Sequence, residues 1–185
     1  MRKKIFFFTF FFIFITPLKA DLKENIIINL EKINNLSFDF EQTINEKTET
    51  GNCVIKYPKK IYCAYNNFNK KIMVSDGNSL VIINQKSNQY YRYPIEKTAL
   101  SLILDKNYLI DQMKILEGRV IDKKYYNFTL IDKEIKINIF FNNQTLNLTG
   151  WQTEDIYQNL TITFISSIKI NQVIEKNKFK IPEPK

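Results

Sequence analysis

The stretch IMVSDGNSLVII, residues 72–83, contains two short apolar segments joined by Asp76-Gly77. An Asp-Gly pair between apolar, β-branched runs is typical of a tight hairpin turn, because such turns need residues that tolerate positive φ. We therefore predict antiparallel strands at 72–75 and 80–83. This hairpin is the clearest of several strand signals and indicates an antiparallel β protein.

Strand signals continue on both sides of the hairpin. Before it, Phe38, Phe40, Gln42 and Ile44 alternate with polar residues, which is the period of a half-buried strand. Strands at 52–57 and 61–65 flank a turn at Pro58-Lys59. After the hairpin, the pattern predicts strands at 89–93, 113–121, 125–131, 135–141, 146–152 and 159–166.

Two segments have a helical pattern. In residues 22–34, Ile26, Leu30 and Ile33 share one face, and Asp21 can cap the start. Residues 98–104 (TALSLIL) follow Pro94 and read as a short apolar helix, whereas 105–112 fits either a helix or a loop. We expect a mainly β (α+β) domain over residues 21–185: one strongly curved antiparallel sheet with two or three helices against its concave face.

The N-terminus has the three parts of a secretory signal peptide. Arg2, Lys3 and Lys4 precede the apolar run 5–15, Thr16-Pro17 ends it, and cleavage is expected after Ala20. A membrane anchor is the alternative, but the run is shorter than the roughly 20 residues that a spanning helix needs. No cysteine for lipid attachment lies near the cleavage site, so we expect a soluble exported protein.

Removal of the leader lowers the charge of the chain. The full chain has 27 Lys and Arg and 19 Asp and Glu; loss of residues 1–20 leaves 23 basic residues, a net charge of +4. The remaining lysines are spread along the chain, singly or in adjacent pairs, and form no basic stripe, which argues against a nucleic-acid partner.

The sequence carries no recognisable catalytic motif. It has no histidine, which removes the commonest general base and metal ligand. Its four glycines are scattered, so a glycine-rich phosphate loop is excluded, and the pair Glu154-Asp155 reads as a turn. We therefore expect no enzyme, no cofactor and no metal site.

The two cysteines flank the turn at Pro58-Lys59. A short turn there places Cys53 and Cys63 opposite each other on adjacent strands, and export favours oxidation. We expect a disulfide; two buried free thiols are the alternative, since a register shift of one residue would prevent the bond.

Several motifs in order resemble the LolA family of periplasmic lipoprotein carriers. These are FDFEQ (38–42), GNCVIKYP (51–58), YCAY (62–65), IMVSDGNSL (72–80), TALSLIL (98–104), DIYQNLTI (155–162) and FKIP (179–182). Each motif alone is weak, but their order and spacing behind a signal peptide are specific, and they span nearly the whole mature chain.

The resemblance implies an incomplete, strongly curved antiparallel barrel with its helices as a lid over an apolar cavity. It implies a monomeric carrier that takes acylated lipoproteins from an inner-membrane ABC transporter (LolCDE-like) to an outer-membrane acceptor (LolB-like). Two alternatives stay open: a periplasmic sensor or adaptor of the same fold, and a carrier of glycolipid or free fatty acid.

The resemblance also suggests which residues serve the cavity, although the chain departs from the family at some of them. The expected cavity wall is Phe38, Phe40, Tyr62, Trp151 and Phe164, with ordinary core packing as the alternative for each. The expected lid contacts are Tyr57, Leu100, Leu102 and Ile103. Tyr57 and Tyr62 stand where the family often has Arg, Cys63 where it often has Trp, and Ala99 where it has Pro.

Overall fold

The fold is built on a single antiparallel sheet. A computed structural model describes residues 22–133, 135–154 and 160–184; the expected signal peptide (1–20), the capping residue Asp21 and the start of the last predicted strand lie outside them. In the described residues the sheet has eleven strands. The first six are β1 (Asn35–Ile44), β2 (Lys47–Lys56), β3 (Lys60–Tyr65), β4 (Lys71–Asp76), β5 (Ser79–Asn84) and β6 (Gln89–Pro94). The others are β7 (Arg119–Ile121), β8 (Tyr125–Asp132), β9 (Ile135–Asn142), β10 (Leu148–Glu154) and β11 (Leu160–Ile170).

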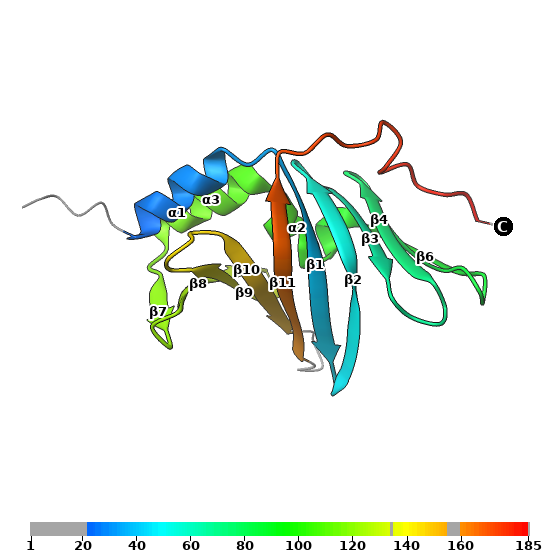
Figure 1. Cartoon of the computed structure of the whole chain (residues 1–185), viewed down its shortest axis with the longest axis horizontal. Helices are drawn as coiled ribbons and strands as arrows, with labels where there is room; N and C mark the ends of the chain where they lie inside the picture. Colours follow the sequence, from blue (N-terminus) through cyan, green and yellow to red (C-terminus); the bar gives the residue numbers. More distant parts are fainter. Residues whose placement is uncertain (1–21, 134, 155–159, 185) are drawn as a thin grey trace, which may run out of the picture.

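The first and last strands meet in the middle of the sheet. The strand order is β6-β5-β4-β3-β2-β1-β11-β10-β9-β8-β7, so all neighbours but β1 and β11 are consecutive in the chain. Gln42 of β1 lies opposite Thr163 of β11, and Phe38 lies opposite Cys53 of β2. The sheet curls without closing, with β6 and β7 at its two edges (Figure 1). The predicted fold class is confirmed.

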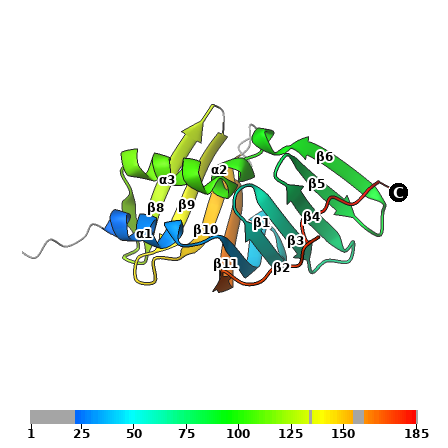
Figure 2. The ribbon, with the colours of Figure 1, turned by 90° about the horizontal axis from the view of Figure 1, so that it is seen from above.

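The helices lie against one face of this sheet (Figure 2). They are α1 (Leu22–Glu31), the 3-10 turn η1 (Ile95–Lys97), α2 (Leu100–Leu104) and α3 (Lys106–Ile115). Ile26, Leu104 and Met113 are fully buried between the helices and the sheet. The inward side chains of β1 (Leu36, Phe38 and Phe40) are buried as well, whereas Asp39 between the two rings and Glu41 after Phe40 are exposed. The alternation read from the sequence therefore places the core on the concave face.

One predicted strand is wrong over most of its length. The segment 113–121 was expected to be extended, but α3 continues to Ile115 and only Arg119–Ile121 forms a strand. The ambiguous segment 105–112 is helical because Asp105 caps α3 by accepting a hydrogen bond from the backbone N–H of Tyr108 (3.2 Å). Leu109 and Met113, four residues apart, then bury one face of that helix.

The C-terminal segment after β11 runs along the outside of the sheet, over the ends of β2 and β3 (Figure 1). Phe179 is only 9% exposed, and Lys178 places its ammonium 4.3 Å from the ring centre of Tyr62. The described helices include none that is long and apolar enough to cross a membrane.

Candidate functional site

A cavity of about 270 Å³ lies between the concave face of the sheet and the start of α2. β1 contributes Phe38 and Phe40, β5 contributes Leu80 and Ile82, β10 contributes Trp151, and Leu100 closes it from α2. Most of its surface is apolar carbon, so the hollow suits an apolar ligand.

The three predicted wall residues of β1 and β10 lie together in this cavity. The rings of Phe38 and Trp151 meet edge to face with their centres 6.4 Å apart. Phe40 packs in the same way on Tyr65, at 4.9 Å. Phe38, Phe40 and Trp151 are each at most 6% exposed, so the aromatic wall is held rigidly by its own ring contacts.

Two other predicted wall residues face away from the cavity, and for them the expectation is wrong. Tyr62 lies between Ile61 and Cys63, which line the cavity, so strand alternation turns its ring to the outer face beneath Lys178. Phe164 is 46% exposed and lies on the outer face, because its neighbour Thr163 is the residue of β11 that points inward.

A few polar side chains also line the cavity. The side-chain amide of Gln42 donates to the hydroxyl oxygen of Thr163 (3.0 Å), and Thr153 and Thr161 lie near them. Lys71 is paired with Glu49 and lies over the ring of Tyr65, 3.8 Å from its centre. The cavity can therefore accept an apolar chain together with a polar group.

Ionisation of Tyr65 is strongly disfavoured in this environment. Burial raises the pKa of its hydroxyl well above the usual range, and the nearby carboxylate of Glu49 raises it further. Tyr65 therefore stays neutral and presents only a dipole to the cavity.

The predicted lid residues contact the cavity and core in different ways. Leu100 lines the cavity directly, whereas Leu102 and Ile103 are buried in the core beneath α2. Tyr57 packs against the same core near α3, with the ammonium of Lys106 5.7 Å from its ring centre. Burial raises the pKa of the Tyr57 hydroxyl well above its usual range.

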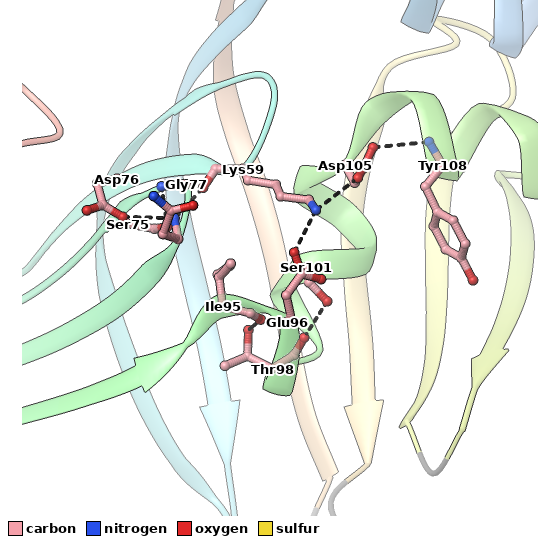
Figure 3. Close-up of polar contacts among 11 residues, drawn as sticks. Lys59, Ser75, Asp76, Gly77, Ile95, Glu96, Thr98, Ser101, Asp105 and Tyr108 are labelled. Atoms are coloured by element: carbon pink, nitrogen blue, oxygen red, sulfur yellow. Dashed lines mark hydrogen bonds and ion pairs between the residues drawn. The ribbon is translucent and has the colours of Figure 1, made fainter.

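The polar attachment of α2 to the sheet comes from Lys59, which the sequence reasoning missed. Its backbone N–H donates to the carbonyl of Leu104 (2.8 Å), and its ammonium lies 2.7 Å from Glu96 and 3.2 Å from Asp105 (Figure 3). The hydrogen bond to Glu96 raises the pKa of Lys59 above its usual value, against the opposing effect of burial. Lys59 has a positive φ of 60° in the turn after Pro58. The sequence pattern did not indicate this backbone conformation, so it did not single out Lys59.

A serine of β4 holds this turn in place. The hydroxyl of Ser75 donates to the carbonyl of Lys59 (2.9 Å) and accepts from the backbone N–H of Gly77 (3.1 Å). The turn at Asp76-Gly77, which identified the hairpin, is therefore linked through Ser75 to Lys59, the residue that attaches α2 to the sheet (Figure 3).

A disulfide joins Cys53 of β2 to Cys63 of β3, which are directly opposite in the register of the two strands. Both cysteines line the cavity, so the bridge forms part of its wall. Within residues 22–133, 135–154 and 160–184, there is no group of three or more His, Cys, Asp or Glu side chains that could hold a metal ion.

Comparison with known proteins gives a family and a set of structural neighbours. The family model described as outer membrane lipoprotein carrier protein LolA matches residues 31–182. No curated protein sequence matches the chain.

The structural neighbours have very low sequence identity to this chain. A putative outer membrane lipoprotein-sorting protein domain from Vibrio parahaemolyticus superposes with a TM-score of 0.51 at 7% identity, covering 86% of this chain and 94% of that one. An uncharacterized conserved protein from Thermus thermophilus superposes with a TM-score of 0.52 at 7% identity, and the superposition again covers 86% of this chain and 94% of that one. A LolA superfamily protein from Nitrosomonas europaea superposes with a TM-score of 0.45 at 10% identity, covering 87% of this chain and 99% of that one. Because the family model covers most of the residues, the chain belongs to the LolA family of outer membrane lipoprotein carrier proteins.

Proposed function

We propose that this protein is a periplasmic carrier that binds the acyl chains of lipoproteins and takes them from the inner to the outer membrane. The observation that carries the proposal is the apolar cavity between the concave sheet and α2, with Phe38, Phe40 and Trp151 on its wall. Its lining is mostly apolar and includes a few polar side chains, among them Gln42 and Thr163, that could face the polar attachment of an acyl group.

The dimensions of the cavity support binding with an intermediate affinity. At about 270 Å³ it is at the low end of ligand pockets, which span roughly 300–1,000 Å³. Full burial of a 16-carbon chain would be worth up to about 12 kcal/mol, at about 0.8 kcal/mol per CH₂. Only part of such a chain fits the cavity as it stands, so the remainder either extends through the open side of the cavity or requires α2 to move away from the sheet. Incomplete burial, or the cost of that movement, lowers the net affinity and helps release.

The rest of the transport route is part of the same proposal. Cleavage of the leader after Ala20 would leave a domain that diffuses between the two membranes. An inner-membrane ABC transporter of the LolCDE type would load it, and an outer-membrane acceptor of the LolB type would take the cargo by binding it more tightly. In this proposal the protein acts as a monomer and catalyses no reaction.

Release of lipoproteins from inner-membrane vesicles tests the proposal. Purified mature protein should liberate lipoproteins from energised vesicles in a soluble complex, and a variant with a filled cavity, Leu80→Trp, should liberate few. If the mature protein releases none while an established carrier does so from the same vesicles, the proposal is wrong.

Native mass spectrometry of protein isolated from its own periplasm separates the remaining candidates. A bound acylated peptide or lipoprotein supports the carrier. A glycolipid or a free fatty acid would instead identify a lipid carrier of another kind, and a stable complex with a periplasmic regulator would favour a sensor or adaptor.

A further inference from the structure

The edge strand β6 leaves one row of backbone groups without partners among the described residues. The backbone N–H of Ile95 donates to the carbonyl of Asn78 (3.0 Å), which continues the register of β5 and β6. Because N–H and C=O groups alternate in direction along a strand, those of Tyr91 and Tyr93 also face β5. The N–H and C=O groups of Tyr90 and Arg92 therefore point outward from the sheet.

This edge has few of the features that usually prevent a strand from pairing. Exposed edges are commonly protected by lysines, bulges, prolines or short length. The sequence QYYRYP has no lysine, the register with β5 has no bulge, and Pro94 is the last residue. The opposite edge, β7, has only three residues. Six regular residues of β6 therefore form an edge that can accept another strand.

The open edge lies beside the candidate cavity. Ile82 and Leu80 of β5 line the cavity, and their cross-strand partners on the same face are Tyr91 and Tyr93. Each of these tyrosines is 44% exposed. They extend the cavity wall to the edge of the sheet, so a chain that leaves the cavity on this side passes over two aromatic rings and reaches β6.

We propose that β6 binds the polypeptide that is attached to the lipid, as an added antiparallel or parallel strand, while the acyl chain occupies the cavity. This inference rests on the proposed carrier function and specifies how its cargo is held. The ligand is an extended peptide segment next to an acylated residue. Pairing through backbone groups is independent of the peptide's side chains, so one carrier could hold many different cargo proteins.

Substitution of Arg92 distinguishes the backbone contact from side-chain contacts. Its N–H points outward, so Arg92→Pro removes a donor for the added strand without removing a bond to β5. Arg92→Ala is the matched control, because it equally removes the side-chain hydrogen bonds to Ser79 (3.0 and 3.1 Å) but keeps the N–H. Circular dichroism establishes that both variants are folded.

The binding experiment compares two probes on the mature protein. One is a palmitoylated cysteine amide; the other carries the same acylated cysteine at the start of a ten-residue polar peptide without proline. We expect the peptide to tighten binding roughly tenfold, since a few net hydrogen bonds are gained. Arg92→Pro should abolish this gain, and Arg92→Ala should retain it.

Hydrogen exchange gives a readout that needs no variant. The amides of Tyr90 and Arg92 should exchange rapidly in the free protein and slow at least tenfold with the peptide-bearing probe, but not with the palmitoylated cysteine amide. Equal affinity for the two probes, or no protection of these amides, overturns the inference while the carrier function stands. If neither probe binds, the carrier proposal itself fails. Protection that depends on protein concentration without any probe would show that two copies pair at β6, which also overturns it.

Discussion

Replacement of Lys59 by methionine should loosen the attachment of α2 to the sheet. The substitution preserves the aliphatic part of the side chain and the backbone N–H that donates to Leu104, and it removes only the ammonium between Glu96 and Asp105. Whatever changes can therefore be assigned to the two ion pairs.

The structure sets the expected size of the effect. The side chain of Lys59 is 25% exposed, Glu96 is 64% exposed and Asp105 is 29% exposed, so solvent weakens the first pair more than the second. Exposed pairs contribute about 0.2–1 kcal/mol each, and we expect a total loss of about 1 kcal/mol. That loss corresponds to a roughly fivefold larger population in which α2 is detached.

Hydrogen exchange of the α2 amides measures that population. The amide of Asp105, which donates to the carbonyl of Ser101 (3.0 Å), should exchange about fivefold faster in Lys59→Met. Lys60→Met is the matched control, because the neighbouring lysine is exposed and points elsewhere. Asp105→Asn keeps a capping side chain, and its double-mutant cycle with Lys59→Met should give a coupling of about 0.5 kcal/mol. Identical exchange in the two lysine variants, or zero coupling, would refute the reasoning.

Three further changes test the cavity, the bridge and the hairpin turn. Phe40→Ala should weaken the binding of a fluorescent fatty acid, whereas Phe164→Ala should leave it unchanged because that ring is on the outer face; equal losses in a titration would contradict this placement. Replacing Cys53 and Cys63 by alanine should lower the free energy of unfolding by roughly 3 kcal/mol, measured in urea, since the bridge closes a short loop. Partial burial alone would raise the pKa of Asp76, but hydrogen bonds from backbone N–H groups outweigh it and lower the pKa. The ionised carboxylate of Asp76 therefore stabilises the fold above about pH 3.9, which is the pKa of Asp in the unfolded chain. This stabilisation is lost as the pH falls through the lower pKa of the folded state. Asp76→Asn should flatten the stability profile measured by thermal unfolding in that acid range, and an unchanged slope would exclude this role.

The strands and the wall residues of β1 could be predicted because their signals are local. Phe38 and Phe40 alternate with Asp39 and Glu41, and the pleat alone puts the two rings on one face. The same rule applies to Tyr62, which alternates with Ile61 and Cys63. If Cys63 points inward, Tyr62 points outward and cannot be part of the cavity wall. In β11 the apolar residues Phe164 and Ile165 are adjacent, so periodicity did not decide which of them points inward.

The segment of α3 could not be decided from the sequence, which left 105–112 open between helix and loop and predicted a strand from residue 113. Its pattern of apolar residues at Leu109, Ile110 and Met113 is compatible with a helix, but the adjoining residues up to Ile121 also suit a strand. The cap at Asp105 and the contact of α3 with α1 decide between the two states, and the contact with α1 joins segments that are far apart in the sequence.

The sequence by itself determined that the chain forms a hairpin-rich antiparallel sheet with apolar helices, because turn chemistry and period-two alternation act between neighbouring residues. Tertiary structure decided the rest. The pairing of β1 with β11 brings the two halves of the sheet together, and the curl of that sheet leaves room for a cavity beneath α2. Lys59 meets Glu96 and Asp105 only when the turn after β2 is brought against α2. Contacts between residues so far apart in the chain carry no local signature, so only the folded molecule shows which lysine ties α2 to the sheet.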